Sequence, residues 1–567
     1  MNLTHRILIV FFISVLSLFS QNITNTLGSG GLFTIKDGST TFFSLDQSDG
    51  ELTLSGSVVL PIPAQDSQVG TIFKGSKRFI HTYKPSGATG GNTFVGINSG
   101  NFSMTAASFT EATFNTSVGF GSMYSLTTGY NNSALGYQAL NDNTSGRENT
   151  ATGYRALFNN TTGFQNSAFG NQALYNNSTS RYNVAFGSKA LYANLTGSRN
   201  AAFGSFALKD NTDGNHNTAY GYVSLNQNTS GSKNAAFGNY SLFTNSDGNN
   251  NTAFGYSSLR QNTTASNNSA FGHQSLNSNS TGYDNAAFGY RALYSNTTGN
   301  QNSAFGKEAL ENSTITGGNS AFGYRALYSN IEGRRNSAFG AFALNNVMGD
   351  ANQSWVGHDN TAFGYEALKN NSSGSGNTAI GHSAGSEITT GENNIAIGDF
   401  AQVPTPSGDG QVVIGNALTS YAGIEVNWTT TSDRRAKANI TDTELGLDFI
   451  YELRPVSYYR KNDDQKRTEY GFIAQDVEKV LDEFEIENTG LISIADNGTY
   501  SMRYNDLFAP LVKAVQQLKE ENENLKKEIA AIKSSMREQV KIELSKILLK
   551  ALDEDAQLKV SLSRTGK

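Results

Sequence analysis

The sequence predicts a mainly β protein, in which a long β-solenoid of 17-residue coils precedes a small α+β domain and a C-terminal coiled coil. Three observations predict this order. Glycines recur every 17 residues through the middle of the chain. The density of charged residues rises abruptly at Ser432, since 47 of the 90 charged residues lie in residues 432–567. Towards the C-terminus, apolar residues follow alternating steps of three and four. The shift in composition indicates a domain boundary at Ser432.

The composition also excludes several classes of function. A length of 567 residues exceeds one ordinary core, so several domains or a repeat array are expected. The net charge of −6, with no basic cluster between aromatic residues, gives no expectation of nucleic-acid binding. The chain has no cysteine, which excludes disulfides and thiolate chemistry. The six histidines are scattered singly, so neither a metal site nor a cofactor is expected.

Residues 1–20 have the features of a secretory signal peptide. Arg6 is followed by an unbroken apolar run at residues 7–19 and by the small residue Ser20. The run is short for a membrane span, although a short N-terminal anchor is the alternative. No other segment predicts a membrane-spanning helix. The mature protein is therefore expected to be secreted, extracellular or on the cell surface, with no membrane span.

Residues 21–93 alternate apolar and polar side chains between turn signals such as Lys36-Asp37-Gly38. This pattern predicts short β-hairpins. No catalytic constellation stands out here. We interpret the segment as an N-terminal β-rich cap or attachment module.

Residues 94–421 form the repeat array. Seventeen residues are too few for two helices but suit two short strands and two tight turns, so one repeat predicts one solenoid coil. Seven extra residues near Trp355 reset the phase, which then continues. No proline lies between Pro85 and Pro404, as uninterrupted strand ladders require. The recurring glycines are 119, 136, 153, 170, 187, 204, 221, 238, 255, 272, 289, 306, 323, 340, 364, 381, 398 and 415.

Three other positions recur beside each glycine. An aromatic or aliphatic residue usually precedes it, a leucine often lies four residues after it, and from Asn115 to Asn394 an asparagine lies four residues before it. Stacked coils place equivalent residues in columns about 4.8 Å apart. We expect the Phe and Leu columns to form a dry core. The Asn column is expected to link amides from coil to coil, and the glycines to adopt positive φ or allow close backbone approach.

The array resembles the left-handed β-roll heads of trimeric bacterial adhesins, whose repeats carry a similar Asn-Ser-x-Ala-Ile-Gly core. Those repeats are shorter and use Ile where this chain uses Phe, for example Phe237.

Residues 422–431 read as an extended connector, and residues 432–506 as a compact α+β domain. Thr441 and Glu444 are spaced as a capping box for a helix that turns Phe449 inward. Residues 456–460 and 469–473 are expected to be strands, and 475–481 a helix. A hairpin is expected over 491–503, around Asp496-Asn497-Gly498.

Three motifs in residues 432–506 carry a second resemblance. They are Ser432-Asp433-x-Arg435-x-Lys437-x-Asn439-Ile440, Leu453-Arg454-Pro455-Val456-x-Tyr458, and Tyr470-Gly471-Phe472-Ile473-Ala474-Gln475-Asp476-Val477-Glu478. Together they resemble the self-cleaving intramolecular chaperone domain of phage tail spikes and endosialidases, which is also seen in the myelin regulatory factor family. In that family the domain trimerises a fibre, guides its folding and then cuts itself off before the serine.

The resemblance implies roles for the residues at the start of the domain. Ser432 would be the nucleophile, Lys437 the general base, and the bond between Thr431 and Ser432 the cleavage site. Asp433 would orient the turn. The chain would act as a single-turnover serine peptidase on itself, with no multiple-turnover activity.

The chemistry of the residues is compatible with these roles. A serine hydroxyl needs a base, and no histidine follows His382. Lys437 is close in sequence, but lowering a lysine pKa from about 10.4 to about 7 requires roughly 4–5 kcal/mol of burial and repulsion. Arg434 and Arg435 are candidates for part of that repulsion. Without the resemblance, the stretch would be an ordinary turn or helix cap.

Residues 507–550 predict a coiled coil, and residues 551–567 a tail. The spacing of the apolar residues along the coiled-coil seam changes after Met536. Such a change is a stutter, which relaxes the supercoil. Asn522 either fixes the register or is a tolerated polar residue. The seam alone leaves dimer and trimer open, and the resemblance favours a homotrimer. The seam residues are Phe508, Leu511, Val515, Leu518, Asn522, Leu525, Ile529, Ile532 and Met536.

These observations favour a secreted, trimeric, fibrous surface protein of adhesin type that matures by self-cleavage. A glycan or another host or surface ligand is expected, of unknown identity. A phage-type tail fibre or glycan depolymerase is the first alternative, although the signal peptide argues against cytoplasmic assembly. A depolymerase would also need paired carboxylates, which the repeat columns do not offer. A purely structural spacer is the second alternative.

Overall fold

The computed structural model describes residues 32–37, 40–46 and 52–54, and then 71–565 without 349–355, 420–421, 424, 426–429, 462, 464 and 488. The predicted signal peptide and part of the connector lie outside the described residues. The chain divides into two compact units, Met1–Arg199 and Asn200–Lys567, each of which is described by itself. Within the described parts of the chain, no helix has the length and apolar character needed to cross a membrane.

The first unit begins with the hairpins that its alternating sequence predicts. Strands β1 (Leu32–Asp37), β2 (Thr40–Asp46) and β3 (Leu52–Leu54) pair antiparallel in that order. Strands β4 (Ile72–Lys74) and β5 (Lys77–His81) form a second hairpin. Strand β5 then pairs antiparallel with the first solenoid strand, β6.

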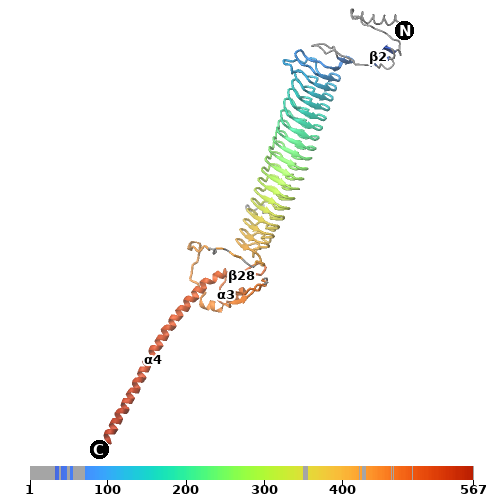
Figure 1. Cartoon of the computed structure of the whole chain (residues 1–567). Helices are drawn as coiled ribbons and strands as arrows, with labels where there is room; N and C mark the ends of the chain where they lie inside the picture. The colour runs from blue at the N-terminus through green and yellow to red at the C-terminus, as the bar shows by residue number, and fades with distance from the viewer. Residues whose placement is uncertain are drawn as a thin grey trace, which may run out of the picture. The chain divides into compact units, whose positions relative to one another are not determined.

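Parallel solenoid coils follow in both units, and Figure 1 shows their strands as successive rungs. In the first unit the strands are β6 (Thr93–Val95), β7 (Thr116–Val118), β8 (Ser133–Leu135), β9 (Thr150–Thr152), β10 (Ser167–Phe169) and β11 (Val184–Phe186). In the second unit they are β12 (Ala201–Phe203), β13 (Thr218–Tyr220), β14 (Ala235–Phe237), β15 (Thr252–Phe254), β16 (Ser269–Phe271), β17 (Ala286–Phe288), β18 (Ser303–Phe305), β19 (Ser320–Phe322), β20 (Ser337–Phe339), β21 (Thr361–Phe363), β22 (Thr378–Ile380), β23 (Ile395–Ile397) and β24 (Val412–Ile414).

Each coil contributes one three-residue strand, where the sequence predicts two short strands. The rest of the coil consists of turns and bends, whose backbone N–H groups donate to carbonyl groups of neighbouring coils. The strands themselves pair in parallel register, so that Phe271 lies opposite Phe288 and Phe288 opposite Phe305. Backbone hydrogen bonds between coils therefore extend well beyond the strands.

The prediction that the Phe column lies in the core is wrong. In β14 the middle residue, Ala236, is fully buried, while Ala235 and Phe237 point outward and are half-buried. Phe254 and Phe363 are 53% and 54% exposed. The reason is the two-residue period of a strand, which turns neighbours to opposite faces. The leucine column, represented by Leu242, does lie in the core as predicted, and an alanine column, represented by Ala236, takes the place of the Phe column.

The Asn column is buried and links the coils as predicted. The backbone N–H of Asn234 donates to Asn217 Oδ1 at 2.9 Å, and its Nδ2 donates to the carbonyl of Gly248 at 2.7 Å. A second, buried Asn column lies seven residues after the recurring glycine. In it Asn228 Nδ2 donates to Asn211 Oδ1 at 2.7 Å and Asn245 Nδ2 donates to Asn228 Oδ1 at 2.8 Å.

The recurring glycines have both features that the sequence predicts. Gly238 has a φ of 132°, and a Cβ there would lie 2.5 Å from the carbonyl oxygen of Gly255. Leu242 also has a positive φ, of 48°. A left-handed backbone at a leucine costs of order 1–2 kcal/mol, so burial of the side chain and hydrogen bonds between coils must hold it there.

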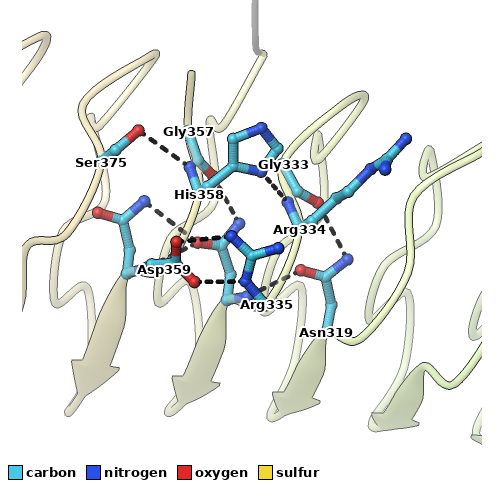
Figure 2. A network of polar contacts seen from close by, with 10 residues as sticks. Asn319, Gly333, Arg334, Arg335, Gly357, His358, Asp359 and Ser375 are labelled. Carbon is cyan, nitrogen blue, oxygen red and sulfur yellow. Dashed lines mark hydrogen bonds and ion pairs between the residues drawn. The ribbon is translucent and has the colours of Figure 1, made fainter. Parts of the chain in front are cut away.

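The seven-residue insertion leaves the strand register intact. Strand β20 pairs with β21 so that Phe339 lies opposite Phe363. Figure 2 shows the polar network at this coil. Arg335 and Asp359 form a two-point ion pair with contacts of 2.7 and 2.8 Å. His358 Nδ1 accepts from the Arg334 N–H at 2.8 Å. Hydrogen bonds and an ion pair therefore join the described coils before and after the insertion.

After the solenoid, the second unit contains a small α+β segment. Its helices are α2 (Leu447–Glu452) and α3 (Ala474–Glu483). Strand β25 (Val456–Tyr458) pairs with β26 (Glu469–Gly471), and β27 (Ile492–Ile494) with β28 (Tyr500–Met502). The core residues are Phe449, Leu453, Val477, Leu481 and Leu491. The strands, the hairpin of β27 and β28, and helix α3 agree with the elements predicted at residues 456–460, 469–473, 491–503 and 475–481.

The predicted capping box at Thr441 and Glu444 is wrong. Helix α2 begins after Gly446, which makes no side-chain cap hydrogen bond. Gln517 of α4 caps the helix instead, since its Oε1 accepts from the Leu447 N–H at 2.6 Å. The sequence predicts a cap from neighbouring residues, whereas a contact from a residue far along the chain satisfies the free N–H at the start of α2.

The described chain ends in the turn η2 (Tyr504–Leu507) and helix α4 (Phe508–Arg564), which is 57 residues long. The helix runs past the predicted coiled coil of residues 507–550 into the expected tail. Its apolar seam is uncovered in this single chain. The side chains of Leu518, Leu525 and Ile532 are each about half exposed.

Candidate cleavage site

Ser432 and Lys437 lie together at the start of the α+β segment. Lys437 Nζ donates to Ser432 Oγ at 2.8 Å. The turn η1 (Arg434–Ala436) lies between them and folds the chain back over five residues. The Lys437 N–H donates to the Arg434 carbonyl at 3.2 Å, which closes this turn. The local sequence is thus sufficient to bring the two side chains within hydrogen-bond distance.

Asp433 is the N-cap of that turn. Its Oδ1 accepts from the Arg435 N–H at 2.8 Å. The same carboxylate pairs with the Arg435 guanidinium, with Nη2 2.6 Å from Oδ2. The hydrogen bonds from Arg435 lower the pKa of Asp433 below its ordinary value, and the pairing raises the pKa of Arg435. Asp433 therefore fixes the turn and stays ionised.

The ion pair bears on the expected source of repulsion for Lys437. The positive charge of Arg435 is paired with Asp433 and so is not a free neighbouring charge. Arg434 lies in the same turn. All residues from Thr431 to Ile440 are exposed in the single chain. The expected burial of Lys437 is thus not provided by its own chain.

The direction of the contact is also informative. Lys437 donates to Ser432 here, whereas a general base must accept the hydroxyl proton. The same two atoms at the same separation can perform either role once the amine has lost its proton. The two side chains lie within hydrogen-bond distance of each other and are exposed. Thr431, whose carbonyl precedes Ser432, is exposed beside them.

Three polar contacts that the sequence does not predict hold the α+β segment together. The Tyr504 hydroxyl accepts from the Phe472 N–H at 3.1 Å, and the Tyr500 hydroxyl donates to Glu478 Oε2 at 2.9 Å. Gln517 joins α4 to α2. No sequence pattern predicts these three contacts. The second Asn column, by contrast, has a clear periodic signal that begins at Asn143.

Within the described residues, no group of three or more His, Asp and Glu side chains is placed to hold a metal ion. Among the described residues of the solenoid, Glu308 and Glu311 have the most buried carboxylates, and both are paired. Arg325 Nε lies 2.6 Å from Glu308, and Arg291 Nη1 lies 2.8 Å from Glu311. These are ion pairs between coils and not an open acidic groove.

The comparisons with known proteins concern the segment that begins at the Ser432–Lys437 contact. No curated protein and no solved structure shows a significant match to the chain. Residues 432–485 match the family described as chaperone of endosialidase, Peptidase_S74. The match starts at Ser432 and includes α2, β25, β26 and α3. A chaperone-of-endosialidase segment that follows solenoid coils fits a tail-fibre-like protein.

Proposed function

We propose that this chain is a secreted, trimeric, fibrous surface protein of adhesin type whose C-terminal chaperone segment drives trimerisation and then cuts itself off. The cut falls between Thr431 and Ser432. The observation that carries the proposal is the 2.8 Å contact between Lys437 Nζ and Ser432 Oγ at the first residue of the family match.

The proposed cleavage is an acyl transfer followed by hydrolysis. Neutral Lys437 takes the hydroxyl proton of Ser432, and Oγ attacks the carbonyl carbon of Thr431. The bond from that carbon to the Ser432 nitrogen breaks, and the nitrogen leaves as an amine after taking up the proton. Water then hydrolyses the ester on Oγ. The products are a carboxylate at Thr431 and a free amino group at Ser432.

The uncovered seam of α4 supports trimerisation. Leu518, Leu525 and Ile529 are each about half exposed on a helix whose apolar residues follow coiled-coil spacing. A single helix of this kind gains little from burial, since no part of the described chain covers the seam beyond its first turns. The α+β segment also exposes two tyrosines, Tyr451 at 83% and Tyr470 at 82%. Packing against other copies would bury both surfaces.

Export and adhesion are supported by the sequence. The basic residue Arg6 and the apolar run of residues 7–19 favour secretion. The solenoid coils supply a long repeated surface for a glycan or another surface ligand. A tail fibre or glycan depolymerase, or a structural spacer, is the competing function. Binding of the full chain to panels of glycans and matrix proteins separates an adhesin from a spacer.

Cleavage is tested with matched variants of the full chain. We expect Ser432→Ala and Lys437→Arg to remain full length, because the first lacks the nucleophile and the second keeps a cation that cannot act as a base. Ser457→Ala, which alters an exposed serine of β25, is the control and should cleave as the parent does. Gel electrophoresis and N-terminal sequencing report the fragment. Cleavage of Ser432→Ala at the same bond would refute the assignment of the nucleophile.

A further inference from the structure

Arginines alternate with aromatic residues along the coils of the first unit. They occupy the position six residues before the recurring glycine, which is Tyr130, Arg147, Phe164 and Arg181 in four successive coils. Because each lies 17 residues after the last, stacking of the coils places them one above another, about 4.8 Å apart. The sequence shows no basic cluster here, since these residues are never neighbours in the chain.

The guanidinium groups of this row lie over the aromatic rings. The Cζ atom of Arg147 is 4.3 Å from the centroid of the Phe164 ring and 6.0 Å from that of the Tyr130 ring. From the next coil, Arg181 Cζ lies 5.4 Å from the same Phe164 ring. A cation within about 6 Å of a ring centroid is attracted to the ring, so these contacts favour a fixed position for each charge.

A third guanidinium lies in the neighbouring column, five residues before the glycine. The Cζ atom of Arg199 is 5.7 Å from the ring of Tyr182, which holds the same place one coil earlier. Arg181 lies over the Tyr182 ring as well, at 5.8 Å. The Arg181 and Arg199 side chains are exposed, and Arg147 is half-buried. The arginine patch is defined as Arg147, Arg181, Arg199, Tyr130, Phe164 and Tyr182.

The patch concentrates positive charge in a chain whose net charge is −6. Residues 149–199 contain no aspartate or glutamate. The carboxylate of Glu148, which is adjacent to the patch in the sequence, accepts from Gln165 Nε2 at 2.6 Å. Among the described residues, neither the Arg147 nor the Arg181 side chain forms an ion pair or donates a hydrogen bond. Their N–H groups are therefore available to an anion.

From this geometry we infer that the arginine patch binds an acidic polysaccharide through its sulfate or carboxylate groups. This ligand class extends the proposed adhesin function and rests on it for the place of the chain outside the cell. A guanidinium presents a planar fork of donors that matches such oxyanions. Arg147 and Arg181 are two coils apart, about 9.6 Å. A linear polysaccharide with an anionic group on each repeat unit can therefore meet both charges in succession.

The covered rings argue against two other ligands. Single-stranded nucleic acid stacks its bases on open aromatic faces, and a neutral sugar likewise needs an open ring face. The Phe164 ring has a guanidinium from the coil before it and another from the coil after it. The patch therefore favours recognition of charge rather than stacking of a base or a sugar ring.

The charges of the patch act over a short range. The Debye length is about 8 Å at physiological salt, so negative charges elsewhere in the chain do little to repel a ligand from the patch. Ion pairs at an exposed surface are individually weak, so binding by one chain should be weak and should be lost in high salt. The three patches of the proposed trimer would bind a long polysaccharide more tightly, because the second and third contacts are intramolecular.

Two pairs of substitutions test this inference in the full chain. Arg147→Gln with Arg181→Gln removes two charges from the patch. Arg155→Gln with Lys189→Gln, the matched control, removes two charges eight residues further along the same coils, so both double variants have the same net charge. The fold should tolerate the patch changes, since Ser198 holds the equivalent place in the next coil. Arg181→Gln alone is the milder variant, and thermal unfolding checks the fold of all of them.

Binding to immobilised dextran sulfate is measured at increasing salt, with dextran as the uncharged counterpart. We expect the parent chain to bind dextran sulfate and not dextran. The patch variant should bind at least several-fold more weakly, Arg181→Gln should lie between it and the parent, and the control should bind as the parent does. Hyaluronan, which has carboxylates and no sulfate, distinguishes the two anionic groups, and binding of either polymer through the patch supports the inference.

Two results of the binding experiment would overturn the inference. An equal loss in both double variants would show that net charge alone attracts the polymer. Tighter binding of a single-stranded oligothymidylate than of dextran sulfate, lost in the patch variant, would replace the polysaccharide by nucleic acid.

Analytical ultracentrifugation and gel electrophoresis of the same samples keep the ligand separate from the proposed fibre. A cleaved trimer that binds neither dextran sulfate nor hyaluronan would overturn the ligand of the patch and leave the proposed fibre intact. An uncut monomer that binds dextran sulfate through the patch would contradict the proposed fibre and support the patch.

Discussion

At the scale of single residues, His81 in the first unit is held as a neutral imidazole. Its Nε2 donates to the Ser99 carbonyl at 2.8 Å, and its Nδ1 accepts from the Tyr83 N–H at 3.4 Å. The ring lies 4.7 Å from the rings of both Phe94 and Phe102. Burial lowers the pKa of His81 from 6.5 to about 4. A second proton on the ring would face the Tyr83 N–H donor.

This arrangement predicts a pH dependence of the first unit. Because the folded-state pKa is depressed, the unfolded state binds the proton more readily between pH 6.5 and about 4. The free energy of unfolding therefore keeps its full value above pH 6.5 and falls by about 3 kcal/mol as the pH drops through this window. His81→Gln, which can keep the donor to Ser99, should reduce the dependence, as measured by thermal unfolding at several pH values.

The control for this prediction is His273→Gln, which changes a histidine stacked between Tyr256 and Tyr290 in the second unit. This variant should retain the loss of stability of the first unit below pH 6.5. An equal loss in the parent and in His81→Gln would show that another group is responsible.

The contact between the site residues could be predicted from the sequence because these residues lie close together in the chain. Ser432 and Lys437 are five residues apart, and the turn capped by Asp433 brings them together without help from the rest of the chain. The pairing of Arg435 with Asp433 was not predicted, although the two residues are close in sequence. The alternatives for Arg435, a free charge or an ion pair, differ only in side-chain rotamers, which a motif does not specify.

At the scale of elements, the sequence predicts the 17-residue period of the coils but not which residues of a coil point inward. A buried Asn four residues before the glycine and an aromatic residue just before it have opposite parity in a strand. Asn234 and Phe237 therefore cannot both point inward. Hydrophobicity favours Phe237 as the buried residue, but paired amides inside the coil fix the opposite choice. Which of the two effects is larger, burial of the phenylalanine ring or hydrogen bonding of the amides, depends on the cross-section of the coil, which the sequence does not specify.

The asparagine columns have a cost wherever they are interrupted. The Oδ1 atoms of Asn296, Asn330 and Asn371 are buried without a hydrogen-bond partner among the described residues. In each case the next coil has Ser313, Val347 or Ile388 in place of the asparagine. A buried polar group that lacks a partner costs about 1–3 kcal/mol. Continuity of the column is therefore a source of stability.

This account predicts that Asn228→Leu destabilises the second unit by about 2–4 kcal/mol. The change removes the bonds from Nδ2 to Asn211 Oδ1 and to the Gly231 carbonyl, and it leaves Asn245 Nδ2 without one acceptor. Gln227→Leu, at the exposed neighbouring position, is the matched control and should have little effect. Denaturant unfolding measures both. Equal stability of the two variants would mean that the buried ladder contributes little.

At the scale of the whole molecule, assembly and cleavage are proposed to be coupled. In the single chain the site is exposed and Lys437 is a donor to Ser432. Packing of three chains would remove water from the lysine, favour its neutral form and press the Thr431 carbonyl towards Oγ. Cleavage would then report correct assembly. Loss of the chaperone segment would also remove the route back, which makes the fibre kinetically stable.

The measurement that tests this coupling most directly is mass spectrometry of the parent chain and of a variant with a broken seam, Leu518→Asp with Leu525→Asp. Both leucines lie on the exposed seam of α4, and two carboxylates there should prevent the coiled coil without entering the core of the α+β segment. The account predicts a fragment of residues 432–567 from the parent and an uncut monomer from the variant. An uncut parent trimer, or a fragment that begins at Ser432 from the monomeric variant, would contradict it.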